Sequence, residues 1–187
     1  MAANTRGRPH ASSREVLADA ACELFLEQGY DATSITEIAR RAGVSRSSFF
    51  NYFESKPGIL WFVFDEHVDR LETALGDGGI PLAAALAGFG DGAPPETLAL
   101  AIVDARNMGV EEELASGRAV RQLRVAGAIA ERMVRAGEAP ISAEVLAAGY
   151  AAALVGAVWR WAMQGAGRHS MQQLVGEALD VAAALRG

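Results

Sequence analysis

Apolar residues recur every three or four positions along most of this chain, which is the spacing of one buried helix face. Between residues 12 and 29 that face is made by Val16, Leu17, Ala20, Ala21, Leu24 and Phe25. Ser12 followed by Glu15 is a capping box that starts the helix. Glycine- and proline-rich pieces separate the periodic segments. The pattern therefore predicts an all-α protein of about nine helices.

Residues 34–58 predict two short helices joined by a tight turn. Ser34 and Glu37 form a second capping box, and Gly43 is the expected stop of the first helix. Ser45 can cap the second helix, which is expected to span about seven residues. Its inward ridge is expected to hold Phe49, Tyr52 and Phe53. Its outward face is expected to hold Arg46, Ser47, Ser48 and Asn51.

A short helix with a small, polar and basic outer face suits the major groove of DNA, where side chains must reach base edges and phosphates. Each of these residues also has a plainer reading, because serines often only cap or solvate a helix and Lys56 is an ordinary surface type. Their order along the chain favours DNA binding.

The run from Leu24 to Lys56 resembles the TetR family of bacterial regulators. The resemblance rests on Leu24-Phe25, Gly29 to Ala39, Ala42 to Ser45 and Phe49 to Lys56, roughly the first third of the chain. It implies a three-helix, helix-turn-helix DNA-binding head (residues 12–56) followed by a helical body for ligand binding and dimerisation (residues 57–187).

The resemblance also implies which residues meet DNA. The expected set is Thr33, Ser34, Thr36, Ser45, Arg46, Ser47, Ser48, Phe50, Asn51, Tyr52 and Lys56. Thr33 and Ser34 are expected at phosphates, and Tyr52 and Lys56 as phosphate clamps. Phe50 stands where the family most often has tyrosine, so one hydroxyl contact is lost and packing on a thymine methyl or a sugar remains.

The net charge of −6 belongs to the body, because residues 1–56 carry seven basic and seven acidic side chains. Residues 1–11 include Arg6, Arg8 and His10, and form either a disordered tail or a flexible basic arm that follows DNA. These basic residues are expected to gather on one side of the head: the arm, Arg40, Arg41, Arg46 and Lys56.

Cys22 is the single cysteine and is interpreted as a small core residue, with a redox sensor as the alternative. No signal peptide is recognised, so a cytoplasmic location is expected.

The body is expected to contain helices from Lys56 to about Leu75, over 81–86, 96–107, 113–136 and 142–164, and from Ser170 onward. Ser142 and a Ser170–Gln173 box are expected to cap the last two. The 145–159 stretch is uncharged and too short to span a membrane. The last two helices are expected to form half of a four-helix homodimer interface. Its expected residues are Gly149, Ala153, Gly156, Arg160, Leu174, Ala178, Leu179 and Ala182.

The predicted function is a sequence-specific transcriptional regulator, a repressor that leaves a near-palindromic operator when a small apolar or aromatic effector binds. Candidate pocket residues are Trp61, Phe64, His67, Phe89, Asp104, Met108, Met133, Trp159 and Trp161. The alternative interpretation is that these residues are ordinary members of the hydrophobic core. An activator or effector-independent factor is the alternative. No cofactor, metal or catalytic constellation is recognised, so an enzyme is not expected.

Overall fold

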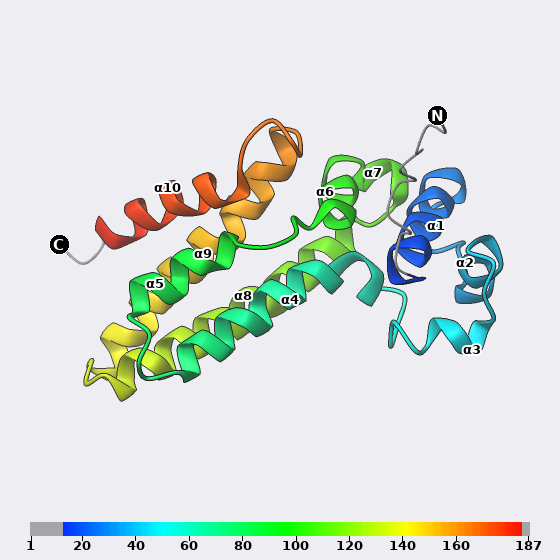
Figure 1. The fold of residues 1–187 in the computed structure, drawn as a ribbon. Coiled ribbons are helices and arrows are strands. Elements are labelled where there is room, and N and C mark those ends of the chain that lie inside the picture. The colour runs from blue at the N-terminus through cyan, green and yellow to red at the C-terminus, as the bar shows by residue number, and fades with distance from the viewer. Residues whose placement is uncertain (1–12, 185–187) are drawn as a thin grey trace, which may run out of the picture.

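The computed structural model describes residues 13–184, which form an elongated all-α protein with a small head at one end (Figure 1). The head holds α1 (Ser13–Gln28), α2 (Ile35–Arg41) and α3 (Arg46–Phe49). The body holds α4 (Gly58–Gly76), α5 (Leu82–Ala87), the 3₁₀ turn η1 (Gly88–Gly90), α6 (Glu96–Val103), α7 (Ala105–Met108), α8 (Glu111–Arg135), α9 (Pro140–Met163) and α10 (Met171–Ala183). The predicted fold class is confirmed.

Several helix ends differ from the sequence prediction. The predicted 96–107 helix is two pieces, because the backbone at Asp104 (φ −103°, ψ 21°) leaves the helical region between α6 and α7. The helix expected from Ser142 begins at Pro140, since proline is tolerated in a first turn and Ala139 takes the cap position. Ser170 does precede α10, but its side chain forms no cap bond, and Gln173 bonds Glu177 instead. The basic arm and the Ser12–Glu15 box involve residues outside the described range.

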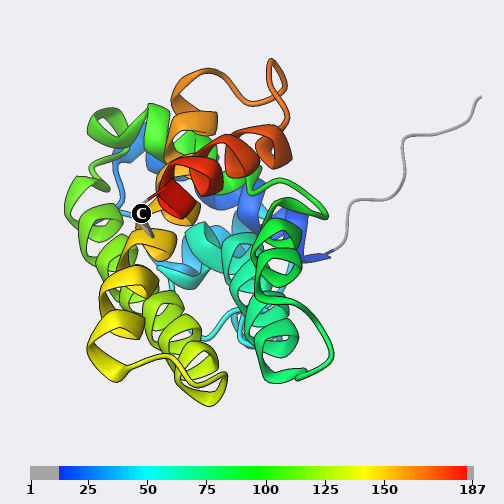
Figure 2. The same cartoon turned by 90° about the vertical axis from the view of Figure 1, so that its left-hand side faces the viewer.

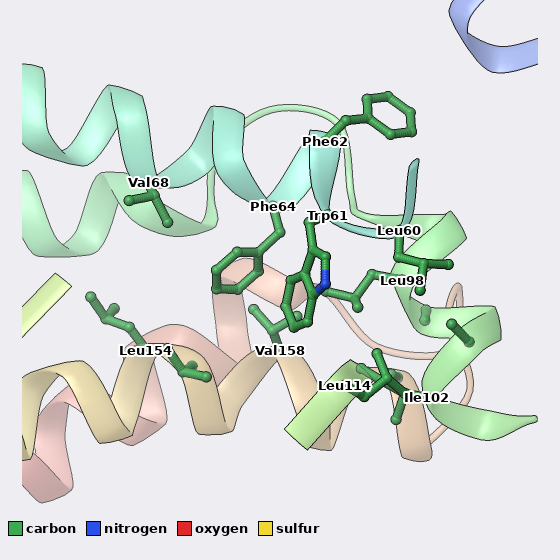
Figure 3. Packing of buried hydrophobic residues seen from close by; sticks show 14 of the residues in the cluster. Leu60, Trp61, Phe62, Phe64, Val68, Leu98, Ile102, Leu114, Leu154 and Val158 are labelled. Carbon is green, nitrogen blue, oxygen red and sulfur yellow. The ribbon is translucent and has the colours of Figure 1, made fainter. Parts of the chain in front are cut away.

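The body packs its long helices around one aromatic centre (Figure 3). Trp61 of α4 is fully buried, with its ring centroid 5.8 Å from Phe64 and 5.9 Å from Trp159. The Arg121 guanidinium lies 4.0 Å from the Trp61 ring centroid and donates to both carboxylate oxygens of Asp65. Trp61 lies in the first turn of α4, so the same helix joins this aromatic centre to the head.

Helix α9 is the apolar centre of the body. The helix has 24 residues and is long and apolar enough to cross a membrane, judged by length and composition only. Residues 145–159 are too short to do so, but the whole helix is not. In this fold α9 packs against α6, α8 and α10 instead (Figure 2). Leu154, Val155 and Val158 are buried, which is the environment of a core helix.

The head is fastened to the body by a few specific contacts. Arg14 at the start of α1 donates to Glu66 of α4 at 2.7 Å. The backbone N–H of Tyr30 donates to the Met108 carbonyl at 2.7 Å. Phe53, after α3, lies 5.5 Å from Phe62, ring centroid to ring centroid. A shift of α4 or α7 would therefore be transmitted to the head through packed groups.

Candidate nucleic-acid interface

The turn between α2 and α3 presents a short helix at the edge of the head. The capping box predicted at the start of α2 is confirmed by bonds in both directions between Ser34 and Glu37. Gly43 has φ +72°, a conformation that costs glycine little, and the Val44 N–H returns to the Ala39 carbonyl. The Ser45 hydroxyl accepts from the Ser48 N–H at 3.0 Å and caps α3. Helix α3 has four residues rather than the expected seven.

The outer face of α3 carries a cation beside an aromatic ring. Arg46 and Ser47 are exposed, and Ser48 is partly exposed. The Arg46 guanidinium lies 5.2 Å from the centroid of Phe50, whose side chain is 43% exposed. A planar donor next to an apolar ring matches a base pair that offers acceptors and a methyl group in the major groove.

Residues 49–53, at the end of the helix-turn-helix, have one buried face and one exposed face. Phe49 and Phe53 are buried, as predicted. Tyr52 was expected both on the inward ridge and at a phosphate; it is 39% exposed, so the inward assignment is wrong. Asn51 is exposed beside it. The hydroxyl of Tyr52 and the amide of Asn51 are thus both accessible to DNA. Thr36 of α2 is exposed as well.

Thr33 does not present its hydroxyl to a phosphate. The side chain is only 2% exposed, and the hydroxyl donates to the Gly29 carbonyl at 2.7 Å. Its role is to close the loop between α1 and α2. The resemblance placed it at the protein surface because a threonine before a capping serine carries no sign of burial in the sequence alone.

Lys56 is also a structural group. Its ammonium donates to the carbonyls of Tyr30 at 2.6 Å and Thr33 at 3.0 Å, and lies 4.0 Å from the Tyr30 ring centroid. Burial lowers the pKa of Lys56, and the carboxylates of Asp31 and Glu113 oppose that shift. Lys56 therefore joins the end of this segment to the α1–α2 loop, and its role as a phosphate clamp stays a prediction. It also precedes α4 by two residues rather than opening it.

The carboxylate of Glu37 occupies the polar groups of Ser34. The Ser34 N–H and hydroxyl both reach Glu37 Oε2, at 2.9 and 2.7 Å. These bonds lower the pKa of Glu37, the backbone bond contributing most. A phosphate at Ser34 would therefore have to displace this carboxylate, which weakens the predicted phosphate contact.

The expected basic cluster is smaller than predicted. Arg41 donates to both oxygens of Glu27, at 2.9 and 2.6 Å, and to Glu23 at 3.1 Å. It fastens α2 to α1 rather than facing DNA. Among the described residues of the predicted basic cluster, Arg40 and Arg46 are exposed and form no salt bridge of the kind that Arg41 forms.

The predicted effector-pocket residues do not surround a common space in this structure. Trp61, Phe64 and Phe89 are buried in contact, with Phe64 5.8 Å from Phe89 by ring centroid. Asp104 is half-exposed and accepts from Asn107. The remaining candidates lie in separate parts of the body: Met108 in α7, Met133 in α8, and Trp159 and Trp161 in α9. The plainer core reading fits them.

His67 is buried and bonded to the η1 region. Its Nε2 lies 2.8 Å from the Ala93 carbonyl oxygen, and its Nδ1 lies 2.8 Å from the Arg70 guanidinium and 2.7 Å from the Phe89 carbonyl oxygen. Nδ1 can accept from Arg70 only when it carries no proton, and can donate to the Phe89 carbonyl only when it carries one, so these two bonds exclude each other. Burial lowers the pKa of His67, with the charge of Arg70 acting in the same direction and the two carbonyl bonds opposing it.

This burial predicts a pH dependence of stability. Unfolding returns His67 to a pKa near 6.5, so the unfolded chain binds a proton that the folded protein excludes. The free energy of unfolding should therefore fall as the pH drops below about 6.5, by up to about 2 kcal/mol at pH 5. Urea unfolding at pH 7.5 and 5.0 measures it. The His67→Gln variant should lose less between the two pH values, and parallel losses would contradict the assignment.

Cys22 lies on the inner side of α1. It is buried, and burial, aided by the charges of Asp19 and Glu23, raises the pKa of Cys22 to about 12. The thiolate that a redox sensor needs is therefore disfavoured, which supports the core reading.

Most of the residues predicted for the dimer interface lie together along a groove between α9 and α10, of about 570 Å³. Those that line it are Gly149, Ala153, Gly156, Arg160, Leu174, Ala178 and Ala182. Leu179 is half-buried and packs against the core instead. Val181, which is not among the predicted interface residues, also lines the groove and is 73% exposed. An apolar residue on the solvent side of an otherwise amphipathic helix was the available signal.

The head has the geometry of a helix-turn-helix unit, and comparison with known proteins gives the family that this segment matches. Residues 17–60 match the family of bacterial regulatory proteins called the tetR family. This segment belongs to that family, as the resemblance implied.

Curated relatives match over the same N-terminal region. The transcriptional activator FasR of Mycolicibacterium smegmatis is 41% identical over 70 residues, 36% of this chain and 32% of the relative. The transcriptional repressor ComR of Escherichia coli is 33% identical over 66 residues, 35% of this chain and 31% of the relative. The matches thus span about a third of these relatives' length.

Similarity over the whole chain comes from solved structures. A protein of Mesorhizobium loti assigned to the TetR family of transcriptional regulators superposes with a TM-score of 0.54 at 18% identity. The match covers 95% of this chain and 98% of that one. At this identity it shows the fold, including the arrangement of the body helices, and nothing of what the body binds.

Proposed function

We propose that this protein is a sequence-specific DNA-binding transcriptional regulator that acts as a homodimer. The single observation that carries the proposal is the exposed Arg46–Phe50 pair on a capped helix of the matching head. Ser47, Asn51 and Tyr52 extend the same exposed face with hydrogen-bonding groups. Arginine pairs with a guanine edge and an aromatic ring packs on a thymine methyl, so this face has the chemistry of base reading.

A dimer follows from the size of the reading face. A four-residue helix reaches only a few base pairs, whereas two related by a twofold axis read a palindrome about one helical turn apart. The α9–α10 groove supplies a surface for such pairing, because glycine and alanine along it allow close helix approach and Val181 offers exposed apolar area.

The dimer proposal predicts that Val181→Glu separates the protomers. Val181 lines the groove and is 73% exposed, so a carboxylate there leaves the fold intact but is buried unpaired when a second copy packs. Sedimentation at micromolar concentration should show a dimer for the wild type and a monomer for the variant. The control is Val120→Glu, at an exposed site on α8 outside this groove. A wild type that sediments as a monomer would refute the proposal.

The DNA-binding proposal is tested by selecting bound duplexes from a random pool at moderate salt. The expected result is one enriched near-palindromic sequence, bound in preference to random competitor. If no sequence were enriched and binding depended on salt alone, the protein would contact only DNA phosphates, and the proposal of sequence-specific binding would be wrong.

Repression and release by a small apolar or aromatic effector remain the proposed mode of action, with activation as the second candidate. The relatives include a repressor and an activator, so the head is compatible with both. Because the candidate pocket residues are packed, an effector must bind a conformation in which the body opens, and its differential affinity for that conformation would supply the release. A cytoplasmic location is proposed from the same function.

A further inference from the structure

A groove runs along the seam between the head and the body. It has a volume of about 590 Å³ and is lined by one face of α1, the start of α4 and the segment that leads into α6. Its apolar surface comes from Ala18, Cys22, Phe62, Val63, Ala93, Pro94 and Leu100. Three carboxylates join them, those of Glu15, Asp19 and Glu96. No basic side chain is among the described residues that line this groove.

Two of these carboxylates, Asp19 and Glu96, are not paired with a basic side chain of the described residues. Arg14, the basic residue of α1 nearest to the groove in sequence, donates to Glu66 and lies 4.6 Å above the Phe62 ring. A complementary occupant therefore needs positive charge and some apolar surface.

The chain itself supplies such a segment beside the groove. Residues 1–12 lie outside the described range and join α1 at Ser13, two residues before Glu15. They include Arg6, Arg8 and Pro9 and no acidic residue. Arg6 is seven residues from Ser13, a reach of roughly 23 Å for extended chain. The α1 side of the groove, from Ser13 to Cys22, rises only about 14 Å. The segment is long enough to fold back along it.

We infer that this basic N-terminal segment docks in the acidic seam groove of its own chain, with Arg6 and Arg8 on the carboxylates of Asp19 and Glu96. The consequence for regulation rests on the proposed function, because a segment held in the seam is withheld from DNA. DNA phosphates and the groove then compete for the same two arginines, and docking reduces operator affinity until the segment is released.

Limited trypsin digestion of the full-length protein, without DNA, tests the docking. Mass spectrometry follows the initial rate of cleavage at the Arg6–Gly7 bond through the product that begins at Gly7. In Asp19→Asn/Glu96→Gln the rate should rise by roughly three-fold or more over the wild type, as expected when two exposed ion pairs are lost. The control, Glu131→Gln/Glu144→Gln, removes the same charge from exposed sites on α8 and α9 and should match the wild type.

Salt and dilution complete the test. At about 0.5 M salt, where exposed charges are strongly screened, the difference between the groove variant and the control should disappear. Equal rates for groove variant, control and wild type at low salt would overturn the inference. Protection that is lost on twenty-fold dilution would also overturn it, since the occupant would then be a second copy. Cleavage of body sites reports any unfolding separately. None of these readouts uses DNA, so their failure leaves the proposed function untouched.

Discussion

Replacing Arg46 by alanine is expected to weaken operator binding by roughly 30-fold to 20,000-fold while leaving stability unchanged. One bidentate arginine–guanine contact is worth about 1–3 kcal/mol, and a dimer makes two such contacts. Arg46 is exposed, and within residues 13–184 its guanidinium lies against the Phe50 ring alone, so its removal leaves no buried group of that range without a partner. Fluorescence anisotropy with the selected operator measures the affinity, and thermal unfolding measures the stability.

Two matched variants make this result specific. Arg168→Ala removes the same charge from an exposed loop between α9 and α10, far along the chain from the head, and should retain operator affinity. Lys56→Ala should instead lower the melting temperature, because two backbone carbonyls lose their donor. If Arg46→Ala kept full affinity and discrimination between sequences, α3 would not be the element that reads bases.

The contrast between Arg46 and Lys56 shows what the local pattern could predict. Capping at Ser34 and Ser45, the stop at Gly43 and the burial of Phe49 depend on neighbours within a few positions, and all of them were predicted correctly. The partners of Lys56 lie 23 and 26 residues away in the chain. A basic residue at a helix start looks the same in sequence whether it faces DNA or a carbonyl.

Long-range pairing explains the other errors too. Arg41 was expected near DNA, but Glu23 and Glu27 lie one turn apart on α1 and receive it. Thr33 was expected at the surface and closes a loop. The pocket residues stay a prediction, because large aromatic residues favour both cores and binding sites, and only packing distinguishes the two. The small-residue pattern on α9 and α10 stays a prediction of a dimer interface, and most of its residues line one groove.

Gly117→Ala is expected to destabilise the body despite the higher helix propensity of alanine. A Cβ at this position in α8 would lie 2.5 Å from Cζ2 and 2.6 Å from Cε2 of Trp61. The indole cannot retreat, because it is fully buried between Phe64, Trp159 and the Arg121 guanidinium. Overpacking of this kind costs about 1–3 kcal/mol, more than the gain of up to about 1 kcal/mol from replacing a helical glycine.

Gly127→Ala on the same helix is the matched control, since a Cβ there meets nothing within 4 Å. It should raise the free energy of unfolding by a few tenths to about 1 kcal/mol, whereas Gly117→Ala lowers it. Combining Gly117→Ala with Trp61→Phe should recover part of the loss, because the smaller ring vacates the space that the new methyl group needs. Urea unfolding of the wild type, Gly117→Ala, Trp61→Phe and their double variant measures the cycle, with Gly127→Ala measured beside them. If the two alanine variants gained stability equally, Trp61 would not be held against α8, and the α4–α8 contact would be looser than this packing requires.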